Sequence, residues 1–121
     1  MLIRFTVLAA DADSGHKQGI LVAAHTLRDE GDLSVEEHME LRTALSWFNE
    51  NLFVPTILDK PEHRRAISWF KPSAIEAIQK MWQLKRLLDS HGLHVDVLRS
   101  EKPGTIVYED ELQVIAKPQR S

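Results

Sequence analysis

The chain has 121 residues, of which 43% are hydrophobic and 27% charged, and its formal net charge is -3. These values predict one globular domain over residues 1–117 and a flexible polar tail over residues 118–121. The absence of cysteine excludes disulfides, iron–sulfur clusters and cysteine-bound zinc, and the acidic balance argues against a general nucleic-acid binder. Because no apolar run approaches the roughly 20 residues of a membrane span, we expect no membrane partner and a cytoplasmic protein.

The N-terminal half predicts one strand and two helices. Residues 2–9 are mostly apolar and rich in β-forming side chains, which favours a strand. The polar residues that follow predict a turn, and apolar spacing over residues 16–30 predicts a helix that ends at Gly31. Ser34 and Glu37 have the spacing of a capping box, which predicts a second helix that reaches about Asn51. Because the link between the two helices is short, we expect them to pack as an antiparallel hairpin.

The C-terminal half predicts one helix among four strands. Residues 65–70 predict a strand, and residues 73–91 predict a helix that ends at Gly92. Alternation predicts a strand near residues 94–98, and the last two strands, residues 105–108 and 112–116, predict a hairpin. The predicted order is therefore β-α-α-β-α-β-β-β. We expect an α+β two-layer sandwich, with a mixed, mostly antiparallel sheet and helices on one face.

A basic and aromatic stretch in the middle of the chain is the strongest candidate for a binding site. We call Arg64, Arg65, Trp69 and Lys71 the basic strand, because the last three would share one face of an extended segment. Arginine beside an aromatic ring can hold a phosphate, a carboxylate or a stacked base. His63 would then be a candidate general acid or base. The alternative is a charged strand end beside an acidic neighbour, with Trp69 half-buried.

An acidic turn follows the first predicted strand. Asp11, Asp13 and His16 supply oxygen and imidazole ligands that could hold Mg²⁺ or Mn²⁺. A metal there would activate water, and Arg65 would stabilise the developing charge of a phosphoester. The alternative is ordinary capping of the next helix by the two aspartates.

Lys85 lies within the apolar stripe of the predicted helix over residues 73–91, four residues before Asp89. A partly buried lysine there could donate a proton or bind an anion, and Asp89 could pair with it. The alternative is that its stem covers apolar surface while its ammonium group reaches solvent.

Other features suggest interactions between chains. A second cluster of acidic residues, Glu109–Glu111, forms the turn of the predicted terminal hairpin. It could complement the basic strand, either within one molecule or across a dimer. Trp47 and Trp82 lie off the centre of their apolar stripes, and the terminal hairpin offers an open edge. We therefore expect a homodimer, formed through the hairpin edge or the tryptophan surfaces.

No motif in the chain defines a reaction, so whether the protein is an enzyme stays open. We expect a binding protein that recognises an anionic group through the basic strand. That group would belong to a nucleotide, a nucleic-acid backbone or an acidic protein partner. One alternative is a metal-dependent phosphoester hydrolase that uses the turn with Asp11 and Asp13, and another is a protein–protein adaptor or inhibitor.

Overall fold

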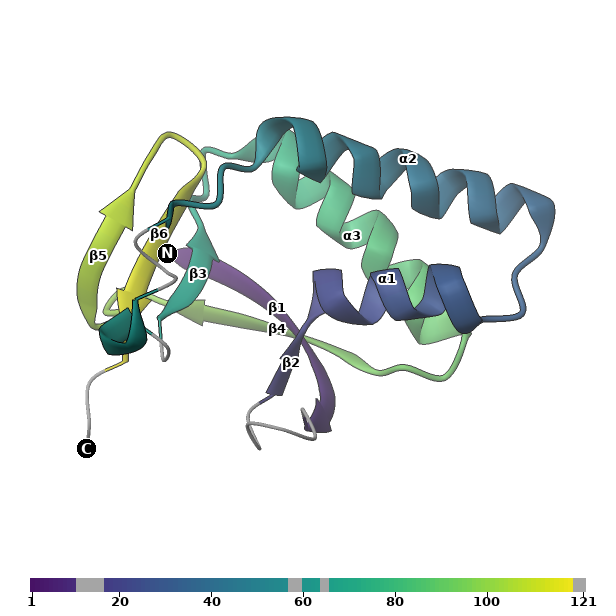
Figure 1. Cartoon of the computed structure of the whole chain (residues 1–121), viewed down its shortest axis with the longest axis horizontal. Helices are drawn as coiled ribbons and strands as arrows, with labels where there is room; N and C mark the ends of the chain where they lie inside the picture. Colours follow the sequence, from purple (N-terminus) through teal and green to yellow (C-terminus); the bar gives the residue numbers. More distant parts are fainter. Residues whose placement is uncertain (11–16, 57–59, 64–65, 119–121) are drawn as a thin grey trace.

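The structure, a computed structural model, describes residues 1–10, 17–56, 60–63 and 66–118. The predicted α+β class and the predicted order of the main elements are confirmed (Figure 1). The strands are β1 (Leu2–Ala10), β2 (Lys17–Gly19), β3 (Ile67–Phe70), β4 (Val95–Ser100), β5 (Thr105–Glu109) and β6 (Gln113–Lys117). The helices are α1 (Ile20–Glu30), α2 (Val35–Asn51) and α3 (Ile75–Ser90), with a 3₁₀ turn, η2, at Pro61–His63.

The sheet is built around β1, whose two edges carry different partners. Along one edge β1 pairs with β4, from Leu2 to Val7. The other edge is shared, because β3 pairs with β1 at Ile3 and β2 pairs with it from Thr6 onward. The sheet continues from β3 to β6 and β5. All pairings between the described strands are antiparallel, whereas the sequence predicted a mixed, mostly antiparallel sheet. The strands on either side of α3 run parallel, but β1 separates them.

The three helices cover one face of the sheet (Figure 1). Their apolar stripes meet the inward-facing side chains of β1, β3 and β4 in one core, which is the main source of stability. The largest fully buried apolar side chains are Leu41, Met81, Leu84, Leu88, Val7 and Val95. Among the described residues, no helix is both long enough and apolar enough to cross a membrane.

Two of the predicted helix ends are confirmed in atomic detail. At the start of α2, the Ser34 hydroxyl accepts the Glu37 N–H at 3.1 Å, and the Glu37 carboxylate accepts the Ser34 N–H at 3.1 Å. At the end of α3, Gly92 has φ +82° and donates to the Asp89 carbonyl, while Leu93 donates to the Leu88 carbonyl. This is the Schellman arrangement, which satisfies the last carbonyls of the helix.

The start of the first helix was predicted wrongly. The apolar spacing suggested a helix from residue 16, but α1 begins at Ile20. The reason is that Lys17–Gly19 pairs with the exposed edge of β1 and forms β2. The predicted turn before it, and the first residue of the predicted strand over residues 65–70, lie outside the described residues.

Candidate functional site

Part of the basic strand can be placed. Lys71 forms an ion pair with Glu109, with 2.6 Å between its ammonium nitrogen and the carboxylate. The acidic turn of the hairpin therefore supplies a partner for the basic strand within one molecule. Trp69 is half-buried, and its indole nitrogen is buried without a hydrogen-bond partner among the described residues. Arg64 and Arg65 lie outside the described residues, so their role stays a prediction.

His63 ends the 3₁₀ turn that precedes β3. Its Nε2 lies 3.7 Å from the Glu62 carboxylate, and its Nδ1 is buried with no partner in the part of the chain that the structure describes. Its side chain is 15% exposed, so direct access for a substrate is limited. The acid–base role stays a prediction.

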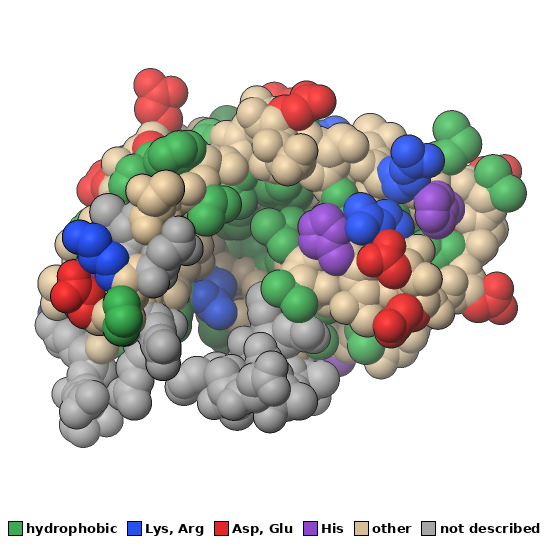
Figure 2. Space-filling model, viewed as in Figure 1, with side chains coloured by type: hydrophobic (Ala, Val, Ile, Leu, Met, Phe, Trp, Pro, Cys, Tyr) green, Lys and Arg blue, Asp and Glu red, His purple; other side chains and the backbone are tan. Residues whose placement is uncertain are grey.

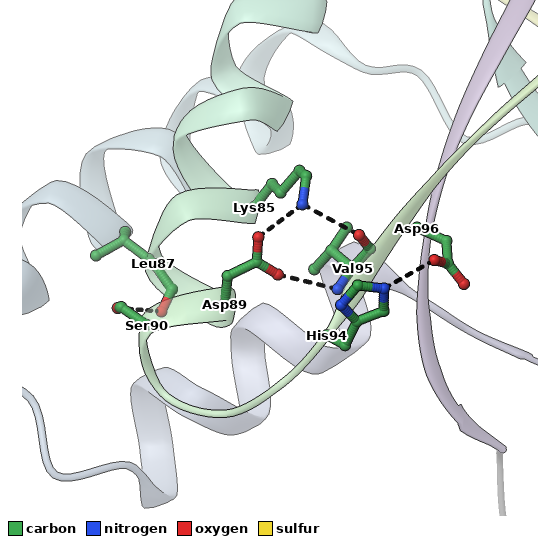
Figure 3. Close-up of polar contacts among 7 residues, drawn as sticks. All are labelled: Lys85, Leu87, Asp89, Ser90, His94, Val95 and Asp96. Carbon is green, nitrogen blue, oxygen red and sulfur yellow. Dashed lines mark hydrogen bonds and ion pairs between the residues drawn. The ribbon is translucent and has the colours of Figure 1, made fainter.

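Lys85 and Asp89 join the end of α3 to the start of β4 (Figure 3). The Lys85 ammonium group donates to the Asp89 carboxylate at 2.6 Å and to the Val95 carbonyl at 3.2 Å. The other Asp89 oxygen accepts the Val95 N–H at 3.0 Å. Burial raises the pKa of Asp89, but the hydrogen bonds from Lys85 and Val95 outweigh it and hold that pKa below its usual value. The predicted Lys85–Asp89 pair is confirmed. These contacts explain Lys85 without a ligand, and its proton-donor role stays a prediction.

The proposed metal ligands Asp11, Asp13 and His16 lie outside the described residues. Within the ranges that are described, no group of three or more His, Asp or Glu side chains could hold a metal ion. The Mg²⁺ or Mn²⁺ site therefore stays a prediction that rests on the sequence.

The two helical tryptophans differ in their surroundings. Trp47 is half-buried, packs edge-to-face on Phe48 and donates to the Glu76 carboxylate at 2.7 Å, which joins α2 to α3. Trp82 packs edge-to-face on Phe5 and is 40% exposed. Of the two, only Trp82 presents a large apolar surface to solvent.

A further site lies where β3 leaves β1. The two strands pair only at Ile3 and Phe70, and β2 pairs with β1 from Thr6 onward. The β1 edge at Arg4 and Phe5 therefore has neither strand beside it. A cavity of about 150 Å³, which we call the Arg4 notch, opens at this gap. Besides Arg4, its lining includes Phe5, Leu21, Leu52, Ser68, Phe70 and Met81. Figure 2 shows a hollow on this side of the molecule, with a basic side chain inside it.

Arg4 is the charged residue among the described residues that line this notch. Arg4 is half-buried, and burial lowers the pKa of its guanidinium. Among the described residues it has no hydrogen-bond or ion-pair partner. The polar side chain of Ser68, which also lines the notch, is satisfied, because its hydroxyl donates to the Gln113 side chain, whose amide donates to the Phe53 carbonyl. A cation held among apolar groups is costly unless an anion pairs with it.

Sequence reasoning missed this site, although one signal was visible. Arg4 interrupts an otherwise apolar strand, which is unusual for a strand buried in the middle of a sheet. The gap beside it depends on where β3 and β2 pair, and that is not a local property of the sequence.

Comparison with known proteins identifies no family: no family model matches the chain, and no curated protein or solved structure matches it. The function therefore has to be inferred from the geometry of the site.

Proposed function

We propose that this protein binds an anionic ligand and that Arg4 holds the anionic group. The observation that carries this proposal is the half-buried guanidinium in the Arg4 notch, which has no partner among the described residues. A ligand oxyanion would satisfy it with charge-assisted hydrogen bonds, which are about twice as strong as neutral ones. The cavity lining is otherwise largely apolar, so the bound charge would be little screened by solvent.

The size of the notch limits the ligand. A volume of about 150 Å³ is close to that of an apolar cavity that accepts benzene. A carboxylate on a compact apolar body fits this volume and the planar donor geometry of arginine. A whole nucleotide exceeds it, so a nucleotide could place only an anionic group in the notch.

Trp69 supports the same interpretation. Arg4 and Trp69 are the chain neighbours of Ile3 and Phe70, the pair at which the ladder between β1 and β3 ends. Both carry N–H donors without an acceptor among the described residues. The expected basic strand, including Arg64 and Arg65, would extend this positive region. A cytoplasmic location and a homodimer through the hairpin edge remain proposals of the same kind, and native mass spectrometry would report the dimer.

Thermal unfolding with added benzoate, acetate and inorganic phosphate tests the proposal. A ligand that binds only the folded state raises the melting temperature with its concentration, and we expect the largest rise with benzoate. The Arg4→Met variant has an uncharged side chain of similar length at this position. In this variant we expect the rise in melting temperature to disappear. Without ligand, the variant should gain about 1 kcal/mol of stability, because a desolvated unpaired group is removed.

Arg99→Met is the matched control, because Arg99 is an exposed arginine on β4 that pairs across the ladder with Ile3. This variant should keep the ligand-induced rise. If none of the three anions changes the melting temperature of the unmodified protein, the proposal is wrong.

A further inference from the structure

A second hollow adjoins the Arg4 notch. It has a volume of about 520 Å³, lies between α1 and α2, and shares Leu21 and Leu52 with the notch. Its floor is apolar, with Leu45 and Phe48 from α2 among its lining residues. The two hollows adjoin each other at these two shared lining residues, and we call them together the long groove. In Figure 2 this side of the molecule is hollowed, with apolar side chains in the depression and with basic, histidine and acidic side chains over the helices.

The basic side chains along the long groove come from both hollows. His25, Arg28 and Arg42 line the hollow between the helices, and Arg4 lines the notch. Among the described residues that line either hollow there is no aspartate or glutamate, but Asp29 lies beside the hollow between the helices, where its carboxylate pairs with Arg28. The complementarity of this surface to an acidic ligand therefore depends on the basic residues that Asp29 does not pair with.

The basic residues are not equally available. Arg28 is paired with Asp29, its neighbour in the chain, at 2.9 Å. Arg42 is exposed and has no hydrogen-bond or ion-pair partner in the described ranges. Arg4 and Arg42 are therefore the two arginines of the groove that have no partner among the described residues.

Exposed apolar side chains border the groove. Val22, which lines the notch, is 55% exposed, and Val54, which lines the hollow between the helices, is 70% exposed. Large apolar side chains at the rim of an apolar depression are typical of interaction sites.

We propose that the long groove binds a short acidic peptide segment of another protein. An apolar side chain of that segment lies over Leu21 and Leu52, and its carboxylates pair with Arg4 and Arg42. This inference rests on the proposed function, because it gives Arg4 the same anion-binding role and names the partner class. The apolar floor supplies affinity, and the two arginines fix the position of the segment.

A nucleic-acid strand fits the groove less well. Binding of single strands relies on exposed aromatic rings that stack on bases, but the aromatic residue of the floor, Phe48, is only 4% exposed. The acidic balance of the whole chain would also oppose a polyanion.

Fluorescence anisotropy with a labelled peptide tests the inference. The probe has a central phenylalanine flanked by glutamates, and its control has glutamine in place of every glutamate. We expect the acidic probe to bind more tightly, with an affinity that falls as salt is added. Arg42→Glu should weaken binding by about fivefold or more, which is the order of losing and reversing an exposed charge pair.

Arg86→Glu is the matched control, because Arg86 is an exposed arginine on α3 that lines neither hollow. It should change the affinity by less than about twofold. Equal binding of the acidic and glutamine probes, or equal losses in the two variants, would overturn the inference. Tighter binding of a single-stranded oligonucleotide than of the acidic peptide would overturn it as well.

The two proposals fail in different ways. Arg42→Glu should leave the benzoate-induced rise in melting temperature unchanged. Arg4→Met should remove that rise and also lower the affinity for the acidic peptide. If benzoate stabilises the protein through Arg4 but the peptide does not bind, the anion site stands and the peptide groove is wrong.

Discussion

At the scale of single residues, the Asp89 carboxylate joins the end of α3 to the start of β4. It accepts one hydrogen bond from Lys85 within its own helix and one from the Val95 backbone at the start of β4. The geometry of the turn between α3 and β4 is therefore held at both ends by the same side chain.

Replacing Asp89 with alanine should lower the free energy of unfolding by about 1–2 kcal/mol, because the Lys85 ammonium group and the Val95 N–H would each lose an acceptor. Urea denaturation measures this loss. Asp29→Ala is the control, since it removes a carboxylate from a solvent-exposed pair with Arg28 and should cost less stability than Asp89→Ala. Equal losses would show that Asp89 acts only as a surface charge.

The sequence predicts residue contacts only where they are local. Lys85 and Asp89 are four residues apart on a helix, so their pairing follows from helix geometry. The contact with Val95 depends on where β4 begins. Arg4 was missed for a related reason, because its lack of a partner depends on β3 and β2 pairing with different parts of β1.

At the scale of elements, two glycines serve turns in different ways. Gly92 has φ +82° at the end of α3, and a Cβ atom there would meet nothing within 4 Å. Gly104 has φ +113° before β5, and a Cβ atom there would lie 1.9 Å from the Lys117 carbonyl oxygen at the end of β6. Gly92 is therefore needed for its left-handed backbone conformation alone. Gly104 is needed for that conformation and also because a side chain would collide with β6.

We therefore expect Gly104→Ala to destabilise the protein more than Gly92→Ala. The Gly92 variant should lose about 1 kcal/mol through the left-handed backbone alone. The Gly104 variant should lose more than about 2 kcal/mol, because the backbone of β6 must also move. Chemical denaturation of both variants tests the order. Gly92→Asn should be milder than Gly92→Ala, since asparagine tolerates this conformation.

Helix ends were predictable because their signals are short. Ser34 with Glu37, and Gly92 after an apolar stripe, each specify a hydrogen-bond pattern within a few residues. The three-residue strand β2 was not predictable, because it exists only where an open edge of β1 accepts it.

At the scale of the whole molecule, three carboxylates make the fold sensitive to acid. The hydrogen bonds from His91 and from the Ser34 backbone hold the pKa of Glu37 below its usual value of 4.5. The pKa values of Asp89 and Asp110 are also lowered, because their hydrogen bonds outweigh the effect of burial. A lowered pKa stabilises the folded state above the usual value, and this contribution is lost as the pH falls through the folded value.

Stability should therefore fall as the pH drops below about 4.5, the usual pKa of glutamate. Glu37→Gln should be less stable than the unmodified protein near neutral pH, and the difference should shrink in acid, where Glu37 is protonated. Urea denaturation across the pH range measures this convergence. Glu40→Gln, at an exposed position of the same helix, is the control. Its free energy of unfolding should differ from that of the unmodified protein by the same amount at every pH. If the difference in unfolding free energy between Glu37→Gln and the unmodified protein stays constant with pH, the lowered pKa of Glu37 is not its cause.

The fold class and the order of elements could be predicted because each element carries its own periodic pattern. The pairing of β5 with β6 could also be predicted, because a short turn joins the two strands, and it is confirmed. The neighbours of the other strands could not be predicted, because their ladders join residues that are far apart in the chain. The sequence left open whether the strands on either side of α3 pair with each other, but the insertion of β1 between them keeps them apart.

The single ladder pair between β1 and β3 has a mechanical consequence. On one side of it, β1, β2 and β4 pack against the helices, and on the other, β6 buries Val114, Ile115 and Ala116 outside the main core cluster. A sheet bends most easily where the fewest hydrogen bonds cross it. The Ile3–Phe70 pair is thus the narrowest ladder between neighbouring strands of the described sheet, and the Arg4 notch opens beside it.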